Sequence, residues 1–153
     1  MPTPQPTTYG IRTIAEQSLK AWFDTNVSML PGVQVNIGQT GEIRTIPAVI
    51  LYAEGADSHP NFGSTPLGNF ELSIKIYVYS SADDATTEAE ALSLHRARVE
   101  AVQSIMQDEA GLKAAWTQGK LYRAWLKSDE EGMSDRRYGN ALTYAAVAVY
   151  PPA

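Results

Sequence analysis

Residues 69–80 read NFELSIKIYVYS, a run in which apolar side chains alternate with polar or aromatic ones. Successive side chains of a β-strand point to opposite faces, so this pattern predicts a half-buried strand with a dry face and a wetter, aromatic face. At about 3.3 Å per residue the strand would reach roughly 40 Å, whereas a compact domain of this length has a radius of gyration near ~15 Å. We therefore expect the strand to extend beyond its own core, where another chain covers it or where it forms an arm in water.

The rest of the chain supplies helices and strands around this run. Apolar residues at helical spacing predict helices over 11–26, 84–108 and 110–117, and alternating or short apolar runs predict strands over 33–37, 46–54, 121–127 and 141–150. Pro47 places the start of the second strand at a sheet edge. The strands cluster and helices separate the clusters, which predicts an α+β fold with a mostly antiparallel sheet and helices packed on one face.

The organisation expected from this pattern is one domain over residues 11–153 after a flexible, Pro/Thr-rich tail over 1–10. The segment 55–68 is rich in Gly and Pro and is expected to form a long hairpin loop. The segment 128–140 (SDEEGMSDRRYGN) is expected to be a polar, charged connection between two strands.

The main helix has a recognisable start and an apolar side. Asp83 or Asp84 is expected to cap it, and Glu88 and Glu90 suit the positive end of its dipole. The predicted apolar side consists of Ala91, Leu92, Leu94, His95, Val99, Val102, Ile105 and Met106.

Composition excludes several classes of function. The chain has 153 residues, a formal net charge of −5 and no cysteine. The negative charge argues against a general grip on nucleic acid, which needs a cationic face. The absence of cysteine excludes disulfides and thiolate metal sites, and two histidines are too few for a histidine-rich metal site. No apolar run approaches the ~18 residues that span a membrane.

Candidate catalytic groups are sparse. The acidic residues around the start of the main helix are explained by helix capping, and His95 is expected to be a hydrogen-bonded core or interface residue. His59 lies in the 55–68 segment without an obvious partner. There is no G-x-S-x-G elbow and no glycine-rich phosphate loop. We predict no catalytic, cofactor-binding or metal-binding residue.

A pattern of charge and aromatic residues indicates contacts between copies of the chain. Asp129, Glu130 and Glu131 precede Arg136 and Arg137, which is typical either of an exposed loop with self-compensating charges or of a clasp between subunits. Tyr and Trp are enriched at interfaces and are also ordinary residues of sheets. The candidate interface residues are Tyr77, Tyr79, Arg123, Trp125, Asp129, Glu130, Glu131, Arg136, Arg137 and Tyr144.

The order of elements resembles a known family. A helix leads to short strands, to the long strand FELSIKIYVYSS, to a helix through EAEALSLHRARVEAVQSIM and to the ending KLYRAWLKSDEEGMSDRRYGNALTYAAVAVY. This order, over about residues 11–150, resembles that of the tail terminator, or tail completion, proteins of tailed bacteriophages and related neck proteins. The resemblance lies in element order and not in a diagnostic motif.

The resemblance implies a structural virion protein without catalytic residues. Such subunits form a ring, typically a hexamer, that caps the tail tube protein and meets the head-side connector, while DNA passes through the lumen without specific binding. The implied location is the virion tail or neck, with assembly in the host cytoplasm. Three alternatives remain open: a head-side neck or adaptor protein, a small-ligand-binding domain, or an unrecognised hydrolase that uses His59 or His95.

Overall fold

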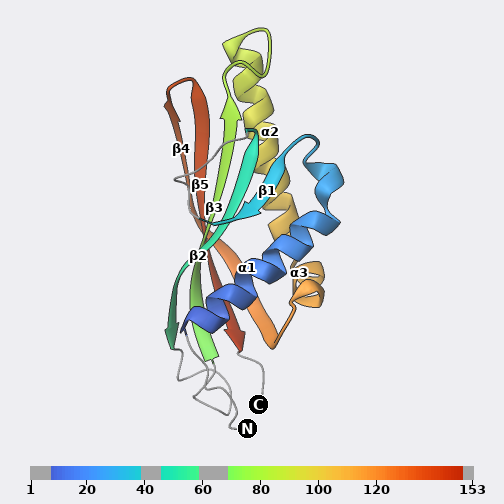
Figure 1. Ribbon diagram of the computed structural model, residues 1–153, viewed down its shortest axis with the longest axis vertical. Coiled ribbons are helices and arrows are strands. Elements are labelled where there is room, and N and C mark those ends of the chain that lie inside the picture. Colours follow the sequence, from blue (N-terminus) through green and yellow to red (C-terminus); the bar gives the residue numbers. More distant parts are fainter. Residues whose placement is uncertain (1–7, 39–45, 59–68, 150–153) are drawn as a thin grey trace.

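The computed structural model describes residues 8–38, 46–58 and 69–149, and it confirms the α+β class (Figure 1). The elements in chain order are α1 (Thr8–Thr25), the 3₁₀ turn η1 (Val27–Met29), β1 (Gln34–Ile37), β2 (Ala48–Ser58), β3 (Asn69–Ser81), α2 (Glu88–Gln107), α3 (Glu109–Ala115), β4 (Lys120–Ser134) and β5 (Arg137–Val149). Figure 1 shows an elongated molecule in which the helices lie along one side of the sheet. Helix α1 begins at Thr8, so residues 8–10 are helical and do not belong to a tail. Residues 55–58 of the predicted loop belong to β2, which reaches Ser58. The rest of that loop, 59–68 with His59, and residues 1–7 of the predicted tail lie outside the described residues, as do residues 39–45.

Strand β3 has the alternation that its sequence predicts. Its side chains alternate between buried and half-buried positions from Phe70 onward, and Ile76 on the dry face is fully buried. Full burial of such a side chain contributes roughly 1.5–3 kcal/mol relative to exposure. The dry face of β3 therefore forms the centre of the core.

The five strands are arranged in the order β1-β2-β3-β5-β4. The pairs β2–β3, β3–β5 and β4–β5 are antiparallel, and only β1 and β2 are parallel. The prediction that Pro47 marks an edge strand is wrong, because β2 lies between β1 and β3. Pro47 is tolerated because it precedes the first ladder residue, where its carbonyl accepts a hydrogen bond from Gln34 N at 3.1 Å.

The helices cover the dry face, as predicted. One continuous core joins Leu19 and Phe23 of α1, Val102 of α2 and Leu112 of α3 to the dry face of the sheet. Helix α2 differs from the prediction at Leu94, which is 40% exposed because the buried stripe of this helix runs through Ala91, His95 and Val99.

The start of α2 also differs from the prediction. The helix begins at Glu88, and the capping side chain is Thr87, whose hydroxyl accepts from Glu90 N at 3.2 Å. Asp84 instead pairs with Arg98 at 2.7 Å. Glu88 and Glu90 do lie in the first turn, near the positive end of the helix dipole.

The segment 128–140 is not a loop. Strand β4 continues to Ser134 and β5 begins at Arg137, so Asp135 and Arg136 alone form the turn. Both turn residues have positive φ, 48° and 61°, which is the backbone of a type I′ hairpin turn. The polar residues on both sides were mistaken for a connection because most of them face water on an exposed hairpin.

The expectation that the two long strands extend beyond their own core is wrong, because other strands of the same chain pair with both of them. Strand β3 is paired with β5 along its whole length and with β2 over most of it, and β5 lies between β3 and β4. The sheet as a whole is elongated, so β3 does not project alone. Among the described residues the two edges of the sheet are β1, which has four residues, and β4, whose 15 residues form the long edge.

Candidate assembly interface

The sheet face opposite the helices, here called the outer face, collects aromatic side chains. Tyr77 and Tyr79 of β3 lie on it, because their parity is opposite to that of the buried residues. Arg123 and Trp125 of β4 lie on the same face, because they pair with Val147 and Ala145, which share parity with outer-face residues of β5. Tertiary structure thus brings four of the predicted interface residues to one face.

One end of the outer face is hollowed into a groove of about 800 Å³, here called the distal groove. Its wall is formed by Tyr77 and Tyr79, whose rings stack with centroids 6.2 Å apart. Its floor contains Gly132 and Gly139, which are opposite each other in the β4–β5 register. A Cβ atom on Gly139 would lie 3.2 Å from Tyr79 Cε1, so the ring lies against the glycine.

Charged groups surround the distal groove unevenly. Its lining includes the acidic residues Glu130, Glu131 and Asp135 and the single base Arg137. Burial raises the pKa of Tyr77, with smaller contributions from Glu54 and Tyr52, so its hydroxyl stays neutral near pH 7. The groove therefore has an aromatic wall, glycines at its base and an acidic rim.

The other end of β4 carries a basic and aromatic patch, defined here as Arg123, Trp125 and Lys127. The Arg123 guanidinium carbon lies 5.1 Å from the centroid of the Trp125 ring, a cation–π arrangement. The β4–β5 register shifts between Leu121 and Arg123 and between Leu126 and Ser128. These shifts break the simple alternation predicted for 121–127, so Leu121 is buried while Arg123 and Trp125 face outward.

Most charges predicted to clasp a neighbour have partners within their own chain. Arg96 of α2 donates two hydrogen bonds to Glu131, at 2.9 and 3.0 Å, which lowers the pKa of Glu131 and raises that of Arg96. Arg136 donates to Asp83 at 2.5 Å and lies 3.9 Å from Glu88. Within the described part of the chain, Glu130 and Arg137 have no ion-pair partner.

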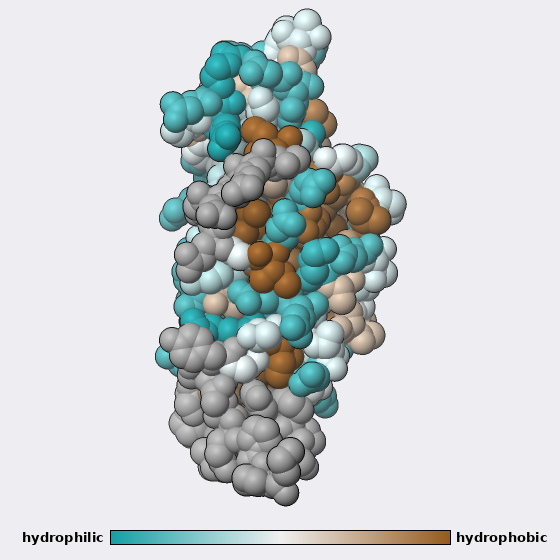
Figure 2. Space-filling view, viewed as in Figure 1, coloured by the Kyte–Doolittle hydropathy of each residue, from teal (hydrophilic) through white to brown (hydrophobic). Residues whose placement is uncertain are grey.

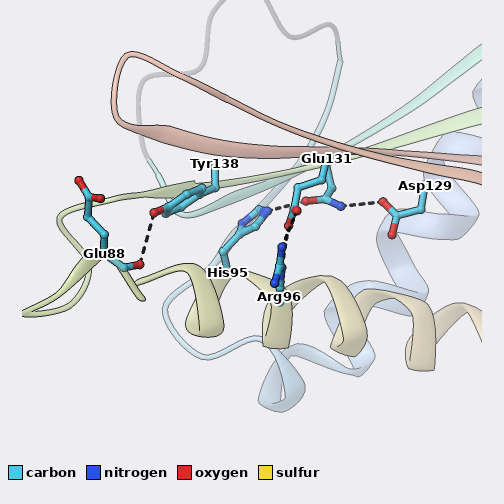
Figure 3. A network of polar contacts seen from close by, with 7 residues as sticks. Glu88, His95, Arg96, Asp129, Glu131 and Tyr138 are labelled. Atoms are coloured by element: carbon cyan, nitrogen blue, oxygen red, sulfur yellow. Dashed lines mark hydrogen bonds and ion pairs between the residues drawn. The ribbon is translucent and has the colours of Figure 1, made fainter. Parts of the chain in front are cut away.

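A buried polar network fastens the hairpin to α2 (Figure 3). His95 Nε2 lies 2.6 Å from Asn140 Oδ1, and His95 Nδ1 lies 2.8 Å from Ser80 Oγ. Asn140 Nδ2 in turn donates to Asp129 Oδ1 at 2.6 Å. Since an amide oxygen only accepts, Nε2 carries the imidazole proton and Nδ1 accepts from Ser80.

The network runs in one direction from a cation to an anion. Arg98 donates to Ser80 Oγ at 3.0 Å, and each following group donates to the next until the chain of hydrogen bonds ends at Asp129. Burial of His95 lowers the pKa of its imidazole, which keeps the ring neutral. His95 also stacks on Tyr138, with ring centroids 5.6 Å apart.

This geometry gives His95 a structural role. Its side chain is fully buried and both ring nitrogens are engaged, so no substrate reaches it. The prediction of a hydrogen-bonded core histidine is confirmed. Among residues 8–38, 46–58 and 69–149, no three His, Asp or Glu side chains come together as a metal site, and no helix is long and apolar enough to cross a membrane.

Tyr144 is a correction to the predicted interface. It shares parity with Leu142 and Ala146, faces the helices and is only 4% exposed. Burial raises its pKa to about 12, with a smaller effect from Asp129. Tyr144 is therefore a core residue of its own chain.

Several important residues were not predicted. Gly132 and Gly139 form the groove floor, and Ser80, Arg96 and Asn140 hold the hairpin to α2. Gly132 and Gly139 are placed symmetrically about the Asp135–Arg136 turn, a signal that becomes visible only once the hairpin is recognised.

The fold is similar to that of a chain from a structure described as "Virion of native gene transfer agent (GTA) particle". The TM-score is 0.60 at 14% sequence identity, and the alignment covers 92% of this chain and 96% of that one. No protein-family model and no curated protein matches the sequence.

Proposed function

We propose that this protein is a structural component of a phage-like virion and acts as a tail terminator. In this role several copies form a ring, with six as the expected number, that caps the tail tube. One face of the ring meets the tail tube protein and the other meets the head-side connector. The protein would be located in the tail or neck of the virion after assembly in the host cytoplasm.

The observation that carries the proposal is the similarity in fold to a chain of a gene transfer agent virion, over nearly the whole length of both chains. The element order of tail terminator proteins is in agreement with it. The long sheet also leaves an aromatic outer face and the edge strand β4 available for contacts. Edge strands and exposed aromatic surfaces are common sites of association.

The charge distribution fits a ring around DNA. The net charge of −5 would weaken sticking to phosphates in a lumen. On the face shown in Figure 2, the end formed by the hairpin tip and the start of α2 is mostly hydrophilic, and hydrophobic residues gather further down. The charges of the hairpin, including Glu130 and Arg137, would orient the contact between copies more than strengthen it.

The native mass of the purified protein tests the ring. We expect a discrete multimer near six times the 16.7 kDa chain mass, with ring-shaped particles in electron microscopy. A protein that stays monomeric at every concentration would contradict the proposal.

Binding partners separate the tail terminator from the head-side adaptor. A terminator should bind the end of assembled tail tubes and stop their growth in vitro. An adaptor should bind the head-side connector and leave tube polymerisation unchanged. We expect the first result.

A further inference from the structure

The outer face carries two different patches that cannot meet within one chain. The distal groove lies where Gly132 pairs with Gly139, and the Arg123–Trp125–Lys127 patch lies where Trp125 pairs with Ala145. Gly139 and Ala145 are separated by roughly 20 Å along β5, at about 3.3 Å per residue. Because both patches belong to one paired sheet, neither can bend over to cover the other.

The two patches are complementary in shape and chemistry. The groove has open space above Gly132, a wall of stacked tyrosines in which the Tyr79 ring lies on Gly139, and an acidic rim with Glu130 unpaired among the described residues. The patch presents a half-buried Trp125 with the Arg123 guanidinium on its ring, and Lys127, two residues further along β4, is exposed. Trp, Tyr and Arg are the residues that most often dominate binding energy when they fill such hollows.

We propose that the patch of one copy docks into the distal groove of the next copy. Trp125 enters above Gly132, beside the Tyr79 ring that lies on Gly139, and Arg123 and Lys127 face Glu130 and Asp135. Glu131 is neutralised by Arg96, but Glu130 and Asp135 still outnumber Arg137, so the rim attracts the cationic patch. This inference rests on the proposed ring and assigns its subunit contact.

The contact joins two different surfaces, which decides the kind of assembly. A head-to-tail contact generates a closed ring or an open filament, whereas a contact between identical surfaces stops at a dimer. Each copy has one groove and one patch, so each can bind two neighbours.

Gly132→Ile tests the groove without disturbing the fold. A Cβ atom at Gly132 has no heavy atom within 4 Å, and a β-branched residue suits a strand. Gly55→Ile is the matched control, because Gly55 is also in a strand, has equally open space and lies outside the groove. We expect Gly132→Ile to raise the protein concentration at which half of the chains are assembled by more than about tenfold. Gly55→Ile should leave that concentration unchanged, and both variants should keep the circular dichroism of the wild type.

Mixing two variants tests the head-to-tail arrangement. Trp125→Ala keeps the groove and loses the patch, while Gly132→Ile keeps the patch and loses the groove. Alone, each should be monomeric in analytical ultracentrifugation, and together they should form a one-to-one dimer that grows no further.

The outcomes distinguish this inference from the proposed function. A wild-type multimer that Gly132→Ile leaves intact would overturn the groove contact and leave the ring standing. A wild-type protein that is monomeric at every concentration would overturn both.

Discussion

His95 couples the main helix to the projecting hairpin through a hydrogen-bond relay that begins at Arg98 and ends at Asp129. In the neutral imidazole, Nε2 donates to Asn140 and Nδ1 accepts from Ser80, so both ring nitrogens are engaged. A second proton on Nδ1 would place a buried positive charge near Arg98 and would end the hydrogen bond that Nδ1 accepts from Ser80. Protonation of this buried side chain is therefore expected to weaken one of the links between α2 and the hairpin.

Acid should destabilise the protein through His95. Its pKa in the folded chain is lowered from 6.5, mainly by burial. The hydrogen bond to Asn140 and the charge of Glu131 raise the pKa, and the charges of Arg98 and Arg96 lower it. The unfolded chain then binds the proton more readily. Stability is full above pH 6.5 and falls as the pH drops below that value toward the lowered folded-state pKa. The melting temperature between about pH 7.5 and about pH 5.5 measures this loss.

The variant His95→Gln provides the control, because glutamine cannot titrate. We expect its melting temperature to change less over this pH range than that of the wild type. The lowered pKa of Glu131 affects stability only below about pH 4.5, outside the range tested. Parallel curves for the two proteins would disprove the role of His95.

At Gly111, replacement by alanine is expected to lower the stability of the fold, whereas helix propensity alone would predict an increase. Alanine is about 1 kcal/mol better than glycine inside a helix, but a Cβ atom at Gly111 would overlap the ring of Trp22. The ring is held in place because Trp22 Nε1 donates to Ile105 O at 2.9 Å. We expect Gly111→Ala to destabilise the fold by about 1–3 kcal/mol in urea unfolding.

Gly55→Ala, outside the distal groove, is the matched control for Gly111→Ala. Its added methyl group meets no atom within 4 Å, so its free energy of unfolding should stay within about 0.5 kcal/mol of the wild type. A stabilised Gly111→Ala protein would mean that Trp22 moves aside freely.

Among the secondary elements, α2 owes its start to Thr87. The Thr87 hydroxyl accepts from Glu90 N, and loss of such a cap costs about 1 kcal/mol. We expect Thr87→Ala to lower the melting temperature by about 2–4 °C. Thr86→Ala, one residue earlier and exposed, should leave it unchanged, and equal effects of the two substitutions would assign the cap elsewhere.

The β4–β5 hairpin is the element that most changes the functional interpretation. Its turn uses Asp135 and Arg136 at positive φ, where Asn-Gly is the usual choice. Arg136 reaches back to Asp83, and Glu131 is bound by Arg96, so two exposed ion pairs tie the hairpin to α2 and the loop before it. These charges secure the projecting end of the subunit, and the uncharged groove floor beside them is left open.

For the whole molecule, backbone protection should follow the strand order. Strands β3 and β5 are paired on both sides, whereas β4 is an edge. We expect amide hydrogen exchange under monomeric conditions to be slowest in β3 and β5 and fast at the outward amides of β4 and at the hairpin tip. Protection of β4 equal to that of β5 in the monomer would contradict this order.

The distribution of layers also explains why association is expected. In the part of the chain that the structure describes, α1, α2 and α3 lie on the dry face, and no helix covers the outer face or the β4 edge. An elongated subunit of this kind has two ends with different surfaces. Such a shape suits head-to-tail contacts between copies.

The sequence by itself determined what depends on local periodicity. The alternation in 69–80 predicted β3 and its buried face, helical spacing predicted α1, α2 and α3, and the mixture of the two predicted an α+β fold with helices on one face. It also placed His95 among hydrogen-bonded core residues. These features follow from side-chain periods of 2 and 3.6, which nearby residues are enough to reveal.

Only the tertiary structure decided what depends on pairing between distant residues. The pairing of β4 with β5 showed that residues 128–140, predicted as a connection, form a hairpin in which Gly132 lies opposite Gly139. The strand order placed β4, and not β3, at an edge of the sheet. It also paired Glu131 with Arg96 of α2, and Arg136 with Asp83 before that helix. Tyr144 was buried in the core by the same packing. The physical reason is that strand neighbours, bulges and ion pairs between residues far apart in the sequence are decided by the packing of the whole sheet, which no short stretch of residues encodes.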